Sequence, residues 1–283
     1  MILDNMVRKP VVAGLFYADN FNALEHQVKG CFIEGSGLPE KKHEGKIKAA
    51  ISPHAGLPYS GKAASHVYKK IAESELRDTF IIIGPNHTGL GYDSVLIDNM
   101  ETPFGEVKVD IELAKEIVKE TPLLLDSMSH VREHSVEIQL PFLQFVARDF
   151  KIVPIVISHI DYKKVGEGIK KAVKNLKRDV CVIASSDFIH HGYNYGFAPF
   201  KENISENVKE ADKKAVELIL KKDPENLMKF VEESGATICG IGPILILLNA
   251  VDFEKAELLE QYTSTDISGD EDSCVDYIGM IMK

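Results

Sequence analysis

Histidine and aspartate side chains follow four separate apolar segments of this sequence, and their placement is its strongest chemical signal. The segments and the residues after them are KAAIS (48–52) with His54, FIIIG (80–84) with His87, KIVPIVIS (151–158) with His159, and VCVIASS (180–186) with Asp187, His190 and His191. Imidazole is the commonest metal ligand among side chains and also carries protons near neutral pH. Two imidazoles and one carboxylate form a familiar donor set for iron(II).

The four segments are short, rich in β-branched residues and almost free of polar side chains. This pattern predicts strands that are covered on both faces, as in a largely parallel sheet. In open α/β sheets, ligands bind beyond the carboxyl ends of the strands. The sequence therefore predicts one convergent polar site at that edge, with a metal ion as its candidate occupant.

Helical periodicity alternates with the predicted strands along the chain. We expect helices over 60–74, 110–120, 134–148, 161–176 and 202–223, and closing strands over about 256–263 and 273–282. Asp223 followed by Pro224 is typical of an N-cap and a first helical residue. Because no linker or repeat divides the sequence, residues 1–283 are expected to form a single α/β domain. Its central sheet would be mixed, largely parallel and flanked by helices.

The composition, 45% hydrophobic and 27% charged residues, is typical of a globular protein, and the formal net charge of −10 argues against nucleic-acid binding. The N-terminal residues lack a signal-peptide core, and the most apolar stretch, GIGPILILLNAV (240–251), is shorter than the roughly 20 residues of a membrane crossing. The four cysteines form no CxxC pair, which favours reduced thiols. We therefore expect a cytoplasmic protein that does not bind a membrane.

Two of the histidines lie in loops bounded by proline and glycine. His54 is in SPHAG (52–56), and His87 is in GPNHTG (84–89). Proline fixes one backbone torsion, and glycine permits a tight turn or a close approach of the backbone. Each motif alone is equally typical of a loop histidine bonded to nearby backbone. Two of them at strand ends favour a shared site.

The segment SSDFIHHG (185–192) leaves two chemical roles open for Asp187. It completes a facial triad with two histidines, or it orients a histidine from behind. The alternative is a purely structural role, in which Asp187 caps the turn. Either His190 or His191 is the candidate general acid or base, and the other is expected to be a surface residue.

Further candidates lie in two other segments. Cys239 precedes a predicted helix, where a lowered thiol pKa would suit a metal ligand or nucleophile; the alternative is a small buried residue. His134 and Glu137 are one helical turn apart and suit contacts to substrate or to metal ligands, or else a polar helix start. The sequence has no GxGxxG after a strand and no GxxxxGK[ST], GxSxG or HExxH, so the corresponding nucleotide, hydrolase and zincin sites are unsupported.

Seven motifs, in order, resemble the Memo family, whose prokaryotic members are also called AmmeMemoRadiSam system protein B. The motifs are KPVVAGLFY (9–17), SPHAG with YSG (52–61), GPNHTG (84–89), ETPFGEV (101–107), EHSVEIQLPFL (133–143), SSDFIHHG (185–192) and CGIGP (239–243). They extend over nearly the whole chain, which makes the resemblance highly specific.

The resemblance implies a fold similar to class III extradiol dioxygenases, non-haem iron(II) enzymes that open catechol rings. Matched motif by motif, it implies metal ligands at His54, His87 and Cys239, with Asp187 and His190 as catalytic residues beside the metal. The third ligand of the dioxygenases is a carboxylate. A thiolate is softer and favours copper(I), zinc or thiolate-ligated iron, so the cysteine argues against ring cleavage.

Three functions follow as hypotheses. The first is a redox protein that holds iron(II) or copper, with zinc as a third option. The second is a binding or adaptor protein that takes a small molecule, peptide or protein in the same cleft. Eukaryotic Memo proteins, described as binding phosphotyrosine-containing peptide, resemble this second type. For a prokaryotic member, the implied partners are the radical SAM and AMMECR-type proteins of the namesake system. The third is metal storage without turnover.

Overall fold

The centre of the protein is one twisted sheet, and the computed structural model describes it within residues 6–42 and 45–283. In spatial order the main strands are β1 (Val7–Arg8), β5 (Asn99–Thr102), β6 (Gly105–Val109), β8 (Lys151–Ile157), β3 (Thr79–Pro85), β9 (Val180–Ser185), β2 (Ala49–Ser52), β12 (Cys274–Met282) and β10 (His190–His191). Beside this path, β11 (Ala256–Thr263) pairs with β12, and β4 (Ser94–Val95) pairs with β8 and with β7 (Leu124–Leu125).

The middle of the sheet is parallel and buried on both faces. Strands β8, β3, β9 and β2 are parallel neighbours, whereas β12 joins β2 antiparallel. Every residue of β2 and β3 is buried, which explains their uninterrupted apolar sequences. The strands predicted over 48–52, 80–84, 151–158 and 180–186 are confirmed to within one residue.

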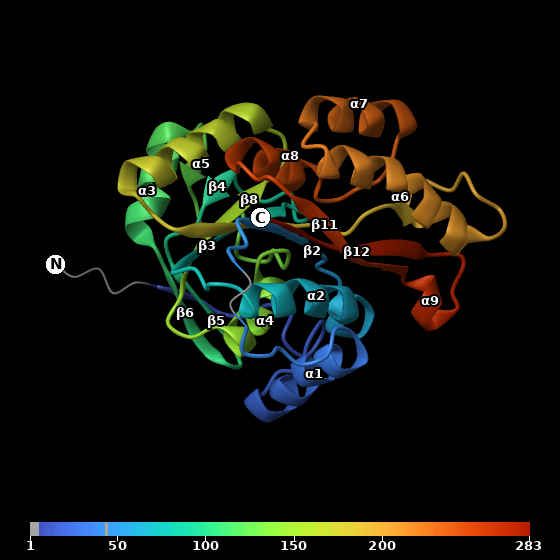
Figure 1. Ribbon diagram of the computed structural model, residues 1–283, viewed down its shortest axis with the longest axis horizontal. Helices are drawn as coiled ribbons and strands as arrows, with labels where there is room; N and C mark the ends of the chain where they lie inside the picture. The colour runs from blue at the N-terminus through green and yellow to red at the C-terminus, as the bar shows by residue number, and fades with distance from the viewer. Residues whose placement is uncertain (1–5, 43–44) are drawn as a thin grey trace.

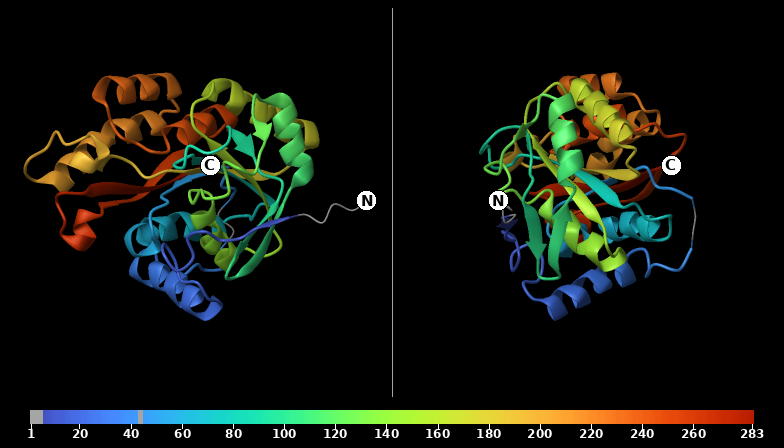
Figure 2. Two further views of the ribbon diagram at one scale, coloured as in Figure 1. Left: turned by 180° about the vertical axis from the view of Figure 1, so that it is seen from behind. Right: turned by 90° about the vertical axis from the view of Figure 1, so that its left-hand side faces the viewer.

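Helices cover the sheet in two layers (Figure 1). One layer contains α1 (Phe21–Glu34), α2 (Leu57–Ala72) and α4 (Leu140–Val146). The other contains α3 (Ile111–Glu120), α5 (Tyr162–Leu176), α6 (Ile204–Leu220), α7 (Pro224–Ser234) and α8 (Ile241–Ala250), while the short α9 (Thr265–Ser268) joins β11 to β12. Figure 2 shows the two layers from behind and from the side. The expected α/β architecture with a mixed, largely parallel sheet is confirmed.

A local sequence signal explains where helix α7 begins. Asp223 caps α7 by accepting a hydrogen bond from the amide of Asn226 at 3.1 Å, with Pro224 in the first helical position, as predicted. No helix in the described residues has both the length and the apolar character needed to cross a membrane.

The helix predicted over 134–148 is wrong at its start. It begins only at Leu140, after a 3-10 turn over Glu137–Gln139. The Glu133 side chain accepts hydrogen bonds from the amides of His134 and Ser135, at 2.8 and 2.9 Å, and holds this stretch in a turn. The turn directs His134 toward the strand ends instead of along a helix.

Candidate metal centre

Three neighbouring strands bring their carboxyl ends to one pocket. Two residues after the end of β2, β3 and β9 come His54, His87 and Asp187, respectively. All three line a pocket of about 420 Å³ together with His134 and His190. The parallel register of the strands places their ends side by side, so the expected convergence is present.

The fourth predicted strand end does not contribute to this pocket. His159 is exposed and is not among the residues that line it. The amide of Asn86 donates to the carbonyl of Ile157, the last residue of β8, at 2.8 Å. The chain after β3 therefore stays paired with the end of β8, and His159 lies outside the pocket.

The ring of His54 is held in one tautomer by Ser185. The Ser185 hydroxyl donates to the carbonyl of Ser135 at 2.6 Å and accepts from Nε2 of Gln139 at 2.9 Å. Because that hydroxyl has only one proton, Nδ1 of His54, 3.0 Å away, has to donate to it. Nε2 of His54 therefore carries the free lone pair. Burial, with His87 and His134 nearby, holds the pKa of His54 well below 6.5, so the ring is neutral.

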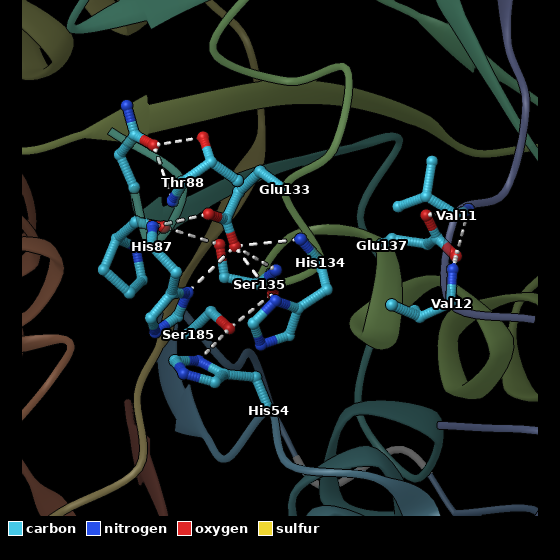
Figure 3. A network of polar contacts seen from close by, with 12 residues as sticks. Val11, Val12, His54, His87, Thr88, Glu133, His134, Ser135, Glu137 and Ser185 are labelled. Carbon is cyan, nitrogen blue, oxygen red and sulfur yellow. Dashed lines mark hydrogen bonds and ion pairs between the residues drawn. The ribbon is translucent and has the colours of Figure 1, made fainter. Parts of the chain in front are cut away.

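The ring of His87 is held in the same way by Glu133 (Figure 3). The Glu133 carboxylate lies 3.0 Å from Nδ1 of His87 and also accepts from the His87 amide at 2.6 Å. Burial alone would raise the pKa of Glu133, but its hydrogen bond to His87, its electrostatic interactions with His87 and His134, and the amide of Ser135 lower it to about 2. The charged carboxylate accepts a hydrogen bond from Nδ1, which therefore carries the proton and leaves Nε2 of His87 free.

Cys239 reaches the site from the loop before α8. Its Sγ lies 3.1 Å from Nε2 of His54 and 3.5 Å from the carbonyl of Asp187. A Cβ on Gly240 would lie 2.3 Å from Cβ of Ser186, so only glycine lets this loop approach the end of β9. The expected lowering of the thiol pKa is wrong, because burial and Asp187 raise the pKa of Cys239 well above its ordinary value.

Asp187 and His190 form the other side of the pocket. Oδ1 of Asp187 accepts from the His54 amide at 2.8 Å, and Oδ2 is 3.9 Å from Nε2 of His54. Burial raises the pKa of Asp187. Nδ1 of His190 faces the carbonyls of Phe188 and Thr237 at 2.9 and 3.0 Å, so it is the protonated nitrogen and Nε2 is free.

Comparison with known proteins identifies the family. The model of the Memo-like protein family matches residues 8–281. The chain belongs to the Memo family. A MEMO1 family protein of Pyrococcus abyssi is 39% identical, covering 98% of this chain and 100% of the relative. MEMO1 family proteins of Methanothermobacter thermautotrophicus, 35% identical over 96% and 99% of the two chains, and of Sulfurisphaera tokodaii, 38% identical over 97% and 99%, are also similar.

Three overlapping groups of side chains in this Memo-family protein have ligand atoms that lie within 4.8 Å of one another. They are His54, His87 and Cys239; Asp187, His190 and Cys239; and His87, Glu133 and His134. The oxygens of Glu133 already accept several hydrogen bonds, which weakens the third group as a metal site. The first group offers two free Nε2 lone pairs and a thiol, the best donor set of the three.

His191, Glu137 and His134 have other surroundings. His190 lines the pocket, whereas the ring of His191 packs on Phe200 with ring centroids 5.5 Å apart; His191 is buried, so the surface position expected for it is wrong. Figure 3 shows Glu137 turned toward Val11 and Val12, whose amides donate to it; it also pairs with Arg8. The ring of His134 stacks on His87 at 4.6 Å. Glu137 thus holds the N-terminal segment, while His134 forms part of the pocket wall.

Two supporting residues had no assigned role in the sequence analysis. Glu133 and Ser185 decide the tautomers of His87 and His54, as described above. Glu133 stands directly before His134 in the sequence, and Ser185 ends a predicted strand. Those positions were the only available signals, because the contacts join segments 46 and 131 residues apart.

Replacing Glu133 with glutamine is expected to weaken metal binding by about 10- to 100-fold, the usual cost of losing a partner behind a metal ligand. The amide removes the negative charge and turns one NH₂ group toward donors that need an acceptor. Competitive titration with a chelator would measure the affinity. Glu260→Gln is the matched control, because Glu260 also pairs with a histidine, His66, at 3.2 Å, but outside the pocket. Equal losses in both variants would contradict this role.

Proposed function

We propose that this protein binds one transition-metal ion, iron(II) or copper, through Nε2 of His54, Nε2 of His87 and Sγ of Cys239. The observation that carries the proposal is the tautomer arrangement, since both rings donate their Nδ1 proton away from the pocket and turn a free lone pair toward the thiol side. Two imidazoles and one thiol suit copper or thiolate-ligated iron, with zinc as a third option.

The chain's own residues support a redox role for that ion. A bound iron or copper ion would supply electron transfer to a ligand in the pocket. Nε2 of His190 is free to hold or move a proton there, and Asp187 positions the His54 backbone and the thiol-bearing loop. The class III extradiol dioxygenases, whose fold the family resemblance implies, use a carboxylate ligand in place of the thiol. We therefore do not extend the proposal to ring cleavage.

Metal analysis of protein purified without oxygen and without a histidine tag tests the proposal. We expect about one iron or copper ion per wild-type chain and less than about one tenth of that in His54→Ala, because binding energy depends on each ligand. His66→Ala is the control for loss of a partly buried histidine elsewhere. Absence of metal from the wild type after anaerobic reconstitution, or full metal content in His54→Ala, would refute the site.

A binding role is the second candidate, and the rim of the pocket favours it. Leu15 is 79% exposed and Tyr59 is 45% exposed, although both line the pocket. Exposed apolar rims are typical of surfaces that meet another molecule. In the cytoplasm, the radical SAM and AMMECR-type proteins of the namesake system are the partners to test. Co-purification of either one, unchanged by His54→Ala and lost in Leu15→Asp, would support this role independently of metal.

A further inference from the structure

The pocket continues beyond the candidate metal ligands into a wall made mainly of rings. Phe16, Tyr59, Tyr195 and Tyr277 belong to this wall, and no lysine or arginine of the described residues lines it. Among the described residues, Asp187 has the only carboxyl group in the lining. A fixed positive charge that would bind a carboxylate or phosphate group is therefore missing from the described lining of this pocket.

Tyr277 differs from the other buried tyrosines in its hydroxyl group. Tyr17, Tyr68 and Tyr262 each donate a hydrogen bond, to Glu137, Gln139 and the carbonyl of Tyr59, at 2.5, 2.6 and 2.6 Å. Tyr277 is only 3% exposed, yet its hydroxyl has no hydrogen-bond partner among the described residues. The Tyr277 hydroxyl is not among the fully buried polar atoms that lack a partner, so it is accessible to a molecule in the pocket.

The position of Tyr277 explains the free hydroxyl. Alternate residues of β12 face opposite sides of the sheet, so Asp276 contacts Asp212 while Val275 and Tyr277 line the pocket. The Tyr277 ring packs on the Tyr262 ring, with ring centroids 5.7 Å apart, and this contact holds the Tyr277 ring in place. Burial and the charge of Asp187 raise the pKa of Tyr277, so the hydroxyl stays protonated and is a donor.

We propose that Tyr277 is a ligand-binding residue whose hydroxyl donates a hydrogen bond to an oxygen atom of an uncharged organic ligand lying against the rings of the pocket. This inference deepens the proposed function, since it names the ligand class for the same pocket. An uncharged ligand fits the metal-free pocket, because no lysine or arginine of the described residues lines it and the lining contains the Asp187 carboxyl. Flat ligands gain most from a wall of aromatic rings.

Benzamide and benzoate are suitable probes, because they are almost identical in shape and differ in charge. Titrated into metal-free protein and followed by NMR, benzamide is expected to bind with a Kd of about 1–10 mM, a usual affinity for so small a molecule. Benzoate is expected to bind at least about tenfold more weakly, because its charge would lose water without gaining a cationic partner. Tyr277→Phe is expected to weaken benzamide binding by about 3- to 10-fold through loss of one hydrogen bond.

Tyr262→Phe is the matched control from the same tyrosine pair. Its hydroxyl is bonded to the Tyr59 carbonyl and the Ala63 amide, so this variant should lower the Tm by about 2–4 °C and leave benzamide binding unchanged. Tyr277→Phe should leave the Tm unchanged. Unaltered benzamide binding in Tyr277→Phe, no benzamide binding to the wild type, or tighter binding of benzoate would each overturn the proposal. Because the protein is metal-free, failure of the metal site would be detected separately, by metal analysis.

Discussion

Replacing Cys239 with aspartate is expected to lower the affinity for copper(I) by more than about 100-fold while iron(II) binding is retained, because thiolate is a soft ligand and carboxylate a hard one. The variant would contain two histidines and one carboxylate, the donor set of non-haem iron(II) enzymes. The Sγ atom of Cys239 lies 3.1 Å from Nε2 of His54, so a carboxylate oxygen reaches the same region. Anaerobic titrations of both metals against chelators of known affinity would measure the change.

Cys31→Asp is the control for this experiment. Cys31 is also partly exposed and forms no disulfide, but it belongs to α1 and does not line the pocket. The Cys31→Asp variant should leave the affinity for both metals unchanged. If Cys239→Asp binds copper(I) as tightly as the wild type, the thiol is not a ligand, and the alternative group of Asp187, His190 and Cys239 fails with it.

A pair of buried carboxyl groups behind the site is expected to make stability fall as the pH rises. Asp212 and Asp276 are fully buried, and their carboxyl groups interact directly with each other. Asp212 also accepts a hydrogen bond from the amide of Ile189 at 2.9 Å, and Ile189 lies between Asp187 and His190 in the sequence. Burial raises the pKa of Asp276 to about 6, and burial together with Asp276 raises the pKa of Asp212 well above 3.8.

The raised pKa values of these two carboxyl groups determine how the free energy of unfolding changes with pH. A carboxyl group whose pKa is higher in the folded state stabilises the fold fully below its unfolded pKa, near 3.8, and loses that contribution as the pH rises through the folded pKa. For Asp276 the loss between pH 4 and pH 7 is about 3 kcal/mol. Asp212→Asn removes one of the two charges and keeps an acceptor for Ile189. Its free energy of unfolding should therefore exceed that of the wild type by about 1–3 kcal/mol at pH 7, with the difference vanishing near pH 4.

Urea unfolding between pH 4 and pH 8 would measure this difference. Asp252→Asn is the control, since that exposed carboxylate pairs with Lys170 and Lys222 and its pKa is lowered to about 2. Its substitution should have a small effect of the opposite sign. A constant gap between wild type and Asp212→Asn at every pH would show that the two buried carboxyl groups do not share a proton.

The sequence by itself determined the parts of the site that depend on periodicity. Continuous apolar runs predict buried parallel strands, and the parallel direction brings the strand ends to one edge. His54, His87 and Asp187 each stand two residues beyond such an end, so their convergence was predictable. His159 follows the same rule and still lies outside the pocket, where the chain after β3 stays paired with the end of β8.

Only the tertiary structure decided which atoms meet. No periodicity predicts that Cys239 approaches His54 across 185 residues; that contact depends on Gly240 packing against Ser186, and only the family resemblance pointed to it beforehand. The free Nε2 atoms depend on hydrogen bonds that the two Nδ1 atoms donate to Ser185 and Glu133, which lie on distant segments. Loop packing and hydrogen bonding are long-range and specific, whereas strand formation is local and repetitive. The strand ends were therefore readable from the sequence, and the donor atoms were not.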